Sequence, residues 1–361
     1  MRYHALAEPD LFVELVKRAP VLDALRDGPS DRKGLERQLG VSTATSYRRT
    51  GWLTKRGLIE ERDDAFVLTA LGAEVDAQVT DLRDAVSEAL GGPWSTPERL
   101  AELLGYGPTL AALREEPLDR RTLQERLEVS RSTCHRHARN LTEADLVERP
   151  ANEYDLTPTG EVVADAVSVF TTHVRAALTL GPVLDRIHGT DPDFDVGFFA
   201  DATVTTAEPG NSSRPVARAI SLFRGTETFR GVRTAAIAPM YLEDERVLDG
   251  LPTEVIEPPE VVEEIMEEYP ERCVEVCVSE YFTHWLHEDL PFGLVIYDDR
   301  VGIGVEGTEG VATFVDTDAS AAQEWAEAVF ESLRREAVLL EGYTKRGLRE
   351  TLATRSSGDR A

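Results

Sequence analysis

Hydrophobic residues recur at helical spacing over roughly the first half of the chain, in a block that carries clear stop signals. A helical stripe ends at Gly28-Pro29, and Asp31 is placed to cap a second helix. After a tight turn, Ser42 caps a third helix that ends near Gly57. Two short apolar runs on either side of Asp63-Asp64 predict a strand, a turn and a strand.

The same pattern occurs again 88 residues later, the difference between 109 and 21. Thr109 laid over Val21 starts a gapless match that continues to Val163 over Val75. The match has roughly twenty identical positions in about 55, and they include Leu35/Leu123, Leu39/Leu127, Val41/Val129, Ser42/Ser130, Thr45/Thr133, Arg48/Arg136, Leu53/Leu141, Leu58/Leu146, Leu68/Leu156, Thr69/Thr157 and Gly72/Gly160. Three helices followed by two strands is the order of a winged helix-turn-helix, so the sequence predicts two such units in tandem.

The pattern changes after the second unit. An apolar-periodic stretch predicts a long helix over 161–187, which Gly181-Pro182 could kink or end early. From residue 195 strands and helices alternate, which is typical of an α/β or α+β domain. The predicted strands are Val196–Phe199, Thr234–Ala238, Glu254–Ile256, Cys273–Val278, Leu294–Tyr297, Gly302–Val305 and Ala312–Val315, and the predicted helices are Pro215–Phe223, Glu260–Glu268 and Ser320–Leu340.

These patterns together predict an α+β protein with five segments. They are a winged helix-turn-helix over 1–80, a second over 95–160, a linker or dimerisation helix over 161–190, an α/β sensor domain over 191–345 and a polar tail over 346–361. The chain has no apolar run near the ~18 residues of a membrane span and begins without a signal-peptide core, so a cytoplasmic protein is expected.

In helix-turn-helix proteins the third helix enters the major groove of double-stranded DNA. Here both third helices lie in acid-free stretches, 37–59 and 129–142, that carry arginine and short hydroxyl side chains suited to guanine and phosphate contacts. The candidate DNA-binding residues are Thr43, Thr45, Ser46, Tyr47, Arg48, Arg49, Arg131, Ser132, Thr133, His135, Arg136 and Arg139. The two helices differ at Tyr47/His135, Arg49/His137, Gly51/Arg139 and Trp52/Asn140, which predicts different half-sites or unequal roles.

The overall charge is unusual for a DNA-binding protein. Acids outnumber bases 66 to 39, for a formal net charge of −27, and lysine is almost absent. This balance is typical of a salt-saturated cytoplasm, where molar salt screens charges beyond about 3 Å. The local distribution of acids therefore decides whether DNA can bind.

The run 290–305, with the later helix segment 325–330, resembles archaeal winged-helix regulators of the methanogenesis-regulator and TrmB-like group. That resemblance implies a phospholipase-D-like sensor domain, although the paired amino-terminal units depart from the single one usual there. Phospholipase-D chemistry needs a histidine with a lysine two residues on and a nearby aspartate. Here His287 is followed by Asp289, with Asp298 or Asp299 beyond, so the resemblance implies a non-catalytic domain.

Three smaller features remain open. Arg214, Arg218 and Arg224, with Arg230 and Arg233 nearby, are candidates for binding a small anionic effector, and the alternative is an arginine face paired with carboxylates. His284 and His287 flank Trp285, and we interpret them as a loop at a strand end rather than a metal site. Cys273 and Cys277 are expected to be core thiols.

The expected function is thus a sequence-specific transcription regulator, dimeric through the long helix, modulated by a small ligand, and without catalytic residues, metal or cofactor. The alternative is a protein-interaction module whose winged helices dock on transcription or chromatin machinery.

Overall fold

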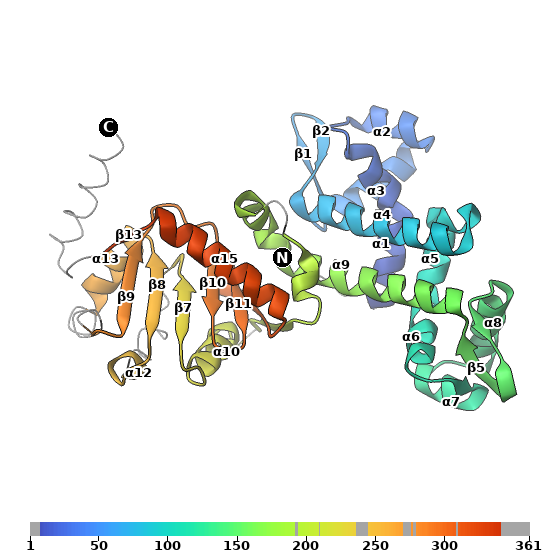
Figure 1. The fold of residues 1–361 in the computed structure, drawn as a ribbon. Coiled ribbons are helices and arrows are strands. Elements are labelled where there is room, and N and C mark those ends of the chain that lie inside the picture. Colours follow the sequence, from blue (N-terminus) through green and yellow to red (C-terminus); the bar gives the residue numbers. More distant parts are fainter. Residues whose placement is uncertain are drawn as a thin grey trace. The chain divides into compact units, whose positions relative to one another are not determined.

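The computed structural model describes residues 8–191, 194–208, 210–235, 245–269, 276, 279–307 and 310–340. It divides into two compact units, residues 1–178 and 179–361. Helices and strands are both abundant, which confirms the α+β class. Figure 1 shows both units and labels many of their helices and strands.

The first unit contains two repeats with the same order of elements. The first repeat consists of α1 (Glu8–Leu25), α2 (Arg32–Leu39), α3 (Thr43–Thr54), β1 (Ile59–Arg62), β2 (Ala65–Leu68) and α4 (Ala70–Leu90). The second consists of α5 (Pro97–Gly105), α6 (Gly107–Glu115), β3 (Leu118–Asp119), α7 (Arg120–Leu127), α8 (Arg131–Glu143), β4 (Val147–Glu148), β5 (Glu153–Leu156) and α9 (Pro158–Thr190). The first helix is continuous in one repeat and divided at Gly105–Gly107 in the other.

Equivalent leucines form the core of each repeat. Leu15, Leu22, Leu35 and Leu53 are fully buried in the first, and their partners 88 residues later, Leu103, Leu110, Leu123 and Leu141, are at most 1% exposed. A surface contact is repeated as well: Arg26 donates to the Thr80 hydroxyl (2.8 Å), and Arg114 donates to the Ser168 hydroxyl (3.1 Å). The two repeats therefore share side-chain packing as well as element order.

The Thr-x-x-Gly motif of both repeats closes the junction between the hairpin and the helix that follows. The Thr69 hydroxyl donates to the carbonyl of Gly57 (2.6 Å) and accepts from the Gly72 N–H (3.0 Å). The Thr157 hydroxyl repeats both contacts, with the Asp145 carbonyl and the Gly160 N–H. A Cβ at Gly72 or Gly160 would lie 1.8 or 1.9 Å from a carbonyl oxygen, of Leu58 or Leu146, so only glycine fits.

The second unit is built on an eight-stranded sheet. Its strands are β6 (Thr203–Thr206), β7 (Phe229–Val232), β8 (Thr253–Glu257), β9 (Phe282–Leu286), β10 (Gly293–Ile296), β11 (Val301–Gly307), β12 (Gly310–Thr317) and β13 (Val338–Leu339), in the spatial order β13-β9-β8-β7-β10-β11-β12-β6. β7, β8 and β9 are parallel to one another, and the other pairs are antiparallel.

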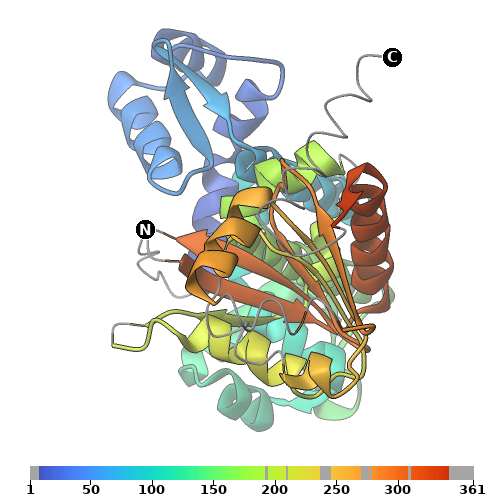
Figure 2. The ribbon, with the colours of Figure 1, turned by 90° about the vertical axis from the view of Figure 1, so that its left-hand side faces the viewer.

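Helices cover both faces of this sheet. α15 (Ser320–Glu336) lies on one face, and α10 (Arg214–Phe223) and α13 (Pro259–Glu268) lie on the other (Figure 2). A short helix, α12 (Glu245–Leu248), precedes β8. The buried core under α10 includes Phe223, Phe229 and Phe314, and α15 places Trp325 parallel to Phe292 with ring centroids 6.1 Å apart.

Several expected elements differ from the structure. Val196–Phe199 is a 3-10 helix rather than a strand, because Asp195 caps it by accepting from the Gly197 N–H. The strand expected at Thr234–Ala238 lies earlier, at β7, where Arg230 interrupts the apolar run; residues 236–238 lie outside the described residues. β6 was missed because it is a threonine-rich edge strand without apolar alternation. α15 ends at Glu336, where the chain turns into β13.

The expected long helix is longer than predicted, since α9 continues through Pro182 to Thr190. By length and composition, α9 is the one helix among the described residues that could cross a membrane, but 44% of its most apolar window is buried inside the protein. Such burial is also found in the core helices of water-soluble proteins. The strand expected at Cys273–Val278 and the polar tail lie almost wholly outside the described residues.

Candidate nucleic-acid interface

Helices α3 and α8 begin in the same way. The Ser42 hydroxyl accepts from the Thr45 N–H (3.3 Å), and the Ser130 hydroxyl accepts from the Thr133 N–H (3.1 Å), which satisfies one free amide in each first turn. The preceding turn needs a left-handed residue, which is Gly40 in the first repeat (φ 61°) and Glu128 in the second (φ 52°). Both helices are thereby aimed by the same local construction.

Three exposed arginines on these helices have no counter-charge among the described residues. Arg48, Arg131 and Arg136 are exposed, and none forms an ion pair with the part of the chain that the structure describes. Arg139 is different because it pairs with Glu143 one turn later (3.3 Å). Arg48 and Arg136 occupy equivalent positions, so each repeat presents one free guanidinium at the same place.

Aromatic exposure adds to the charge in the first repeat. The Tyr47 side chain is 68% exposed, and the Arg32 guanidinium lies 5.0 Å from the centroid of its ring. His135 is the exposed residue at the equivalent position of the second repeat. An exposed aromatic ring beside cations on a surface helix is able to contact both phosphate and base edges.

The serine and threonine candidates on these helices are either buried or already hydrogen-bonded within the protein. Ser46 is 1% exposed, so it cannot reach a ligand, and we remove it from the candidate DNA contacts. Thr43 donates to Glu36 (3.1 Å). Thr45 and Thr133 share hydrogen bonds with the capping serines, and Ser132 lies 2.8 Å from the Ser130 hydroxyl. These hydroxyls fix the helix start, and any phosphate contact would come in addition.

Two of the four positions that differ between the helices face the protein. Trp52 lies beneath the Arg18 guanidinium, 4.6 Å from its ring centroid, and the equivalent Asn140 donates to the Tyr106 hydroxyl (2.8 Å). His137 is half-buried against the Thr109 hydroxyl (3.1 Å); burial, with a smaller effect of Arg136, lowers the pKa of its imidazole. Arg49, the equivalent of His137 in the first repeat, is half-buried as well. The positions at which the two helices could read different bases are therefore Tyr47/His135 and Gly51/Arg139, where both residues are exposed.

The hairpins that follow α3 and α8 carry different charge. The tip of the first is Asp63-Asp64, with both residues exposed and at positive φ. The second has Ala151-Asn152 in the same left-handed region. An acidic tip repels phosphate, so the two hairpins cannot contact DNA equally well.

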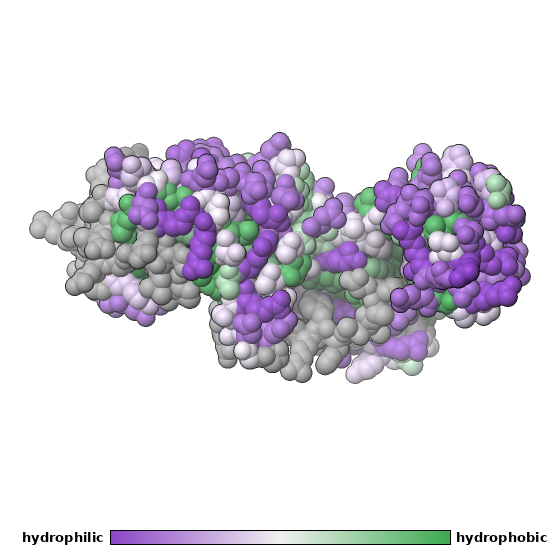
Figure 3. All heavy atoms as spheres, turned by 90° about the horizontal axis from the view of Figure 1, so that it is seen from below, coloured by the Kyte–Doolittle hydropathy of each residue, from purple (hydrophilic) through white to green (hydrophobic). Residues whose placement is uncertain are grey.

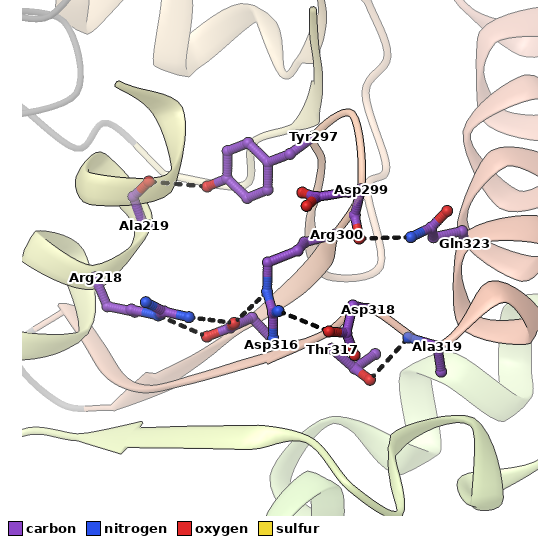
Figure 4. Close-up of polar contacts among 10 residues, drawn as sticks. All are labelled: Arg218, Ala219, Tyr297, Asp299, Arg300, Asp316, Thr317, Asp318, Ala319 and Gln323. Carbon is purple, nitrogen blue, oxygen red and sulfur yellow. Dashed lines mark hydrogen bonds and ion pairs between the residues drawn. The ribbon is translucent and has the colours of Figure 1, made fainter. Parts of the chain in front are cut away.

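The arginines proposed as an anion site in the second unit are already paired. Arg218 makes two hydrogen bonds to Asp316 (3.0 and 2.8 Å), and Arg300 makes a third to the same carboxylate (2.9 Å), as Figure 4 shows. Asp316 is fully buried, so its charge needs these cations. Arg214 pairs with Glu208, and Arg224 also has a partner. The alternative of an arginine face paired with carboxylates is therefore the better description.

Figure 4 also shows how this cluster connects elements. The Tyr297 hydroxyl donates to the carbonyl of Ala219 in α10 (3.0 Å), and Arg300 reaches Asp318 (3.2 Å) before α15. Sequence reasoning missed Asp316. The available signal was an acid within the apolar strand 311–316, which in a core requires a paired cation.

A second buried charge lies between β7, β8 and β9. Glu257 is 1% exposed and accepts from Arg233 (3.1 Å), with His284 Nε2 at 2.7 Å. Burial alone would raise the pKa of Glu257, but the charges and hydrogen bonds of His284 and Arg233 outweigh it and lower the pKa to about 2. His284 thus lies inside a strand, and the expected loop is wrong.

The residues singled out by analogy with phospholipase D have structural contacts. His287 is buried, and its Nδ1 accepts from the Asp289 backbone N–H (3.1 Å). Asp298 accepts from the backbone N–H groups of Glu227 (2.5 Å) and Thr228 (2.8 Å), which holds the turn before β7. Among the described residues no three His, Cys, Asp or Glu side chains are grouped to hold a metal ion. Cys273 and Cys277 lie outside these residues.

Two models of known protein families match this chain, one over each of the two repeats and the other over most of the second unit. The model of the HVO_A0261 N-terminal domain matches twice, over residues 6–90 and 95–179, which confirms the duplication. The model of the middle domain of the methanogenesis regulatory protein FilR1 matches residues 212–336. These matches support a transcription regulator. No curated protein matches the chain.

Solved structures show only distant likeness. TrmBL2, described as an archaeal chromatin protein with a novel mode of DNA binding, is 11% identical over 64% of this chain and 93% of its own, with a TM-score of 0.32. Mitomycin 7-O-methyltransferase is 14% identical over 76% and 61%, with a TM-score of 0.22. An O-methyltransferase family 2 protein from Planctomyces limnophilus DSM 3776 is 15% identical over 63% of each chain, with a TM-score of 0.15.

Proposed function

We propose that this protein is a cytoplasmic transcription regulator that binds double-stranded DNA sequence-specifically. In this proposal each repeat is a winged helix-turn-helix, with α3 and α8 as the recognition helices, and the second unit is a non-catalytic sensor domain. The order of elements in each repeat and the match to a methanogenesis regulatory protein support it.

One observation carries the proposal: Arg48 and Arg136 are exposed, unpaired within the described residues and equivalent in the two repeats. In a protein with a formal net charge of −27, surface arginines commonly find a carboxylate, as Arg99, Arg121 and Arg139 do. A cation kept free of acids on a helix is suited to a phosphate or a guanine. The hydrophilic surface over the second repeat, on the right in Figure 3, fits a polar partner.

The direct test is selection of bound sequences from a random duplex library in molar KCl. The wild type is compared with the double variant Arg48→Ala/Arg136→Ala. Because a base-reading arginine contributes ~1–3 kcal/mol, we expect an enriched motif with the wild type and at least about a tenfold loss of affinity for it in the variant.

The matched control is Arg99→Ala/Arg335→Ala, which removes the same charge from two exposed sites outside α3 and α8. Unchanged affinity in the control with loss in the test variant supports DNA recognition by these helices. If the folded wild type enriches no motif, the proposal fails, and docking of the repeats on another protein becomes the better explanation.

For the sensor role we propose that a small polar ligand binds at the amino ends of β7 and β8. A cleft of about 400 Å³ is lined there by Arg230, Glu254, Glu280, Asp298 and Glu327, among others. Arg230 pairs with Glu327 and Glu254 in this cleft, so the four acids still outnumber the one arginine. This balance favours a cationic or neutral donor-rich ligand over the anionic effector considered from the sequence.

A thermal-shift screen of polyamines and amino sugars tests this cleft in the full chain. We expect a ligand whose stabilisation is lost in Glu327→Gln and retained in Glu324→Gln, an exposed acid on the same helix. A panel without any shift, or equal shifts in both variants, removes the cleft from the proposal.

A further inference from the structure

Two helices of the first repeat contact their own equivalents in the second repeat. α1 packs against α5, which is the first helix of the second repeat. α4 meets α9, which follows the hairpin in the second repeat, through a hydrogen-bond contact between Gln78 Oε1 and His173 Nδ1 (3.1 Å). An interface in which a surface binds its own copy is the signature of two-fold symmetry.

The packed core of this interface has the same property. Phe12 of the first repeat contacts Phe170 of the second, with ring centroids 6.0 Å apart. The equivalent of Phe12 in the second repeat is Leu100, and the equivalent of Phe170 in the first repeat is Leu82. Both leucines are buried, each with 2% exposure. All four apolar positions of the symmetric arrangement are therefore inside the protein.

Two clefts beside the interface repeat the relation most clearly. One has a volume of about 180 Å³; Val16, Pro20, Val79 and Thr80 of the first repeat line it, and the second repeat contributes Leu100. The other has about 490 Å³; Leu104, Pro108, Val167 and Ser168 line it, and the first repeat contributes Phe12. Each residue named for the second cleft is the equivalent, 88 positions away, of a residue named for the first cleft. The roles of the two repeats are exchanged: the repeat that supplies four of these residues in one cleft supplies the fifth in the other.

Such an exchange arises when the two repeats are related by an approximate two-fold rotation, and a head-to-tail arrangement would not produce it. We infer that the first unit is an internal pseudo-dimer, so that a single chain presents two recognition helices to an operator made of two inverted, unequal half-sites. The operator part of this inference rests on the proposed DNA binding.

The inference changes the role expected of α9. Val163, Phe170 and Val174 of its apolar stripe, which suggested a homodimer, are buried within one chain, whereas Val162 and Val169 are exposed. Operators of helix-turn-helix dimers are palindromic because the two subunits are identical. Here the exposed pair Tyr47/His135 differs between the repeats, so the half-sites should differ in sequence while keeping inverted orientation.

The interface itself is tested without DNA. With the three native cysteines replaced by serine, a short bis-maleimide should link the peptides that carry Gln78→Cys and His173→Cys within a chain of monomer mass. Peptide mass spectrometry detects this linked pair, and neither single variant can give it. A product of doubled mass would show that the repeats pair between chains and would overturn the internal pseudo-dimer.

The operator is tested by the mass of the full chain bound to its selected duplex in molar KCl, and by footprints of two single variants. We expect one chain per duplex, with Arg48→Ala losing protection of one half-site and Arg136→Ala losing the other. Two chains per duplex, or both variants losing the same half, would overturn the inference. Failure of the internally cross-linked, folded chain to bind any duplex would instead overturn the proposed function and the operator with it.

Discussion

Gly40 and Glu128 occupy the same left-handed turn of the two repeats with different chemistry. At φ near 50–60° a side chain with a Cβ costs about 1–2 kcal/mol, and glycine avoids this cost. The second repeat therefore carries strain that the first does not.

From this difference we expect Glu128→Gly to raise the free energy of unfolding by about 1 kcal/mol and Gly40→Ala to lower it by a similar amount. Urea denaturation at constant high salt measures both. Equal effects of the same sign in the two variants would contradict the strain at Glu128.

The buried Glu257 carboxylate predicts how the stability of the folded protein changes at acid pH. Its pKa is lowered to about 2 in the folded protein by His284 and Arg233, against 4.5 ordinarily, so its charge stabilises the folded state above pH 4.5. That stabilisation is lost as the pH falls from about 4.5 towards 2, and the shift corresponds to ~3 kcal/mol. The loss should be visible in unfolding free energies measured at pH 5 and pH 3.

The variant Glu257→Gln should be destabilised at neutral pH by about 3–5 kcal/mol, because it leaves the buried Arg233 guanidinium without its counter-charge, and it should lose less stability on acidification. The control Glu263→Gln, an exposed acid on α13, should follow the wild type. If Glu257→Gln keeps the full acid dependence, other carboxyl groups are responsible.

At the scale of elements, the hairpin tips distinguish the two repeats. Asp63 and Asp64 place two exposed carboxylates where the other repeat has Ala151 and Asn152. We expect Asp63→Asn/Asp64→Asn to raise DNA affinity several-fold, since asparagine tolerates the left-handed turn and removes the repulsion of phosphate.

Titration of the selected duplex at two salt concentrations measures this effect, which should shrink as salt rises. The matched control is Asp84→Asn/Glu88→Gln on α4, which removes equal charge. An equal gain in the control would mean that net charge, rather than the hairpin tip, limits binding.

At the scale of the whole molecule, 66 acids against 39 bases predict that stability depends on salt. Self-repulsion of a net −27 charge opposes the compact state, and salt screens it. We expect the Tm to rise between about 0.2 M and 2 M KCl, measured by circular dichroism, with a smaller rise in sucrose of equal osmolarity. A Tm independent of KCl would show that the acidic surface is not adapted to salt.

The two repeats show which residue pairs the sequence could identify and which roles it could not assign to them. Leu35/Leu123, Thr69/Thr157 and Gly72/Gly160 recur because packing and the hairpin junction demand them, whereas Arg48/Arg136 recur without an ion pair to any described residue. The sequence comparison could find all these pairs but could not separate the two groups. Ser46, included among the DNA contacts for its hydroxyl, proved to be on the buried side of its helix.

The sequence by itself determined the α+β class, the repeat and most helices and strands, because these depend on local periodicity, capping and turn residues. Only the tertiary structure decided which charges are free: Arg218 was committed to Asp316 from 98 residues away, and Glu257 to His284 across β8 and β9. It also decided that Phe12 meets Phe170 inside one chain. Such pairings join residues far apart in the chain, and no local pattern encodes which distant surface will cover a given apolar or charged face.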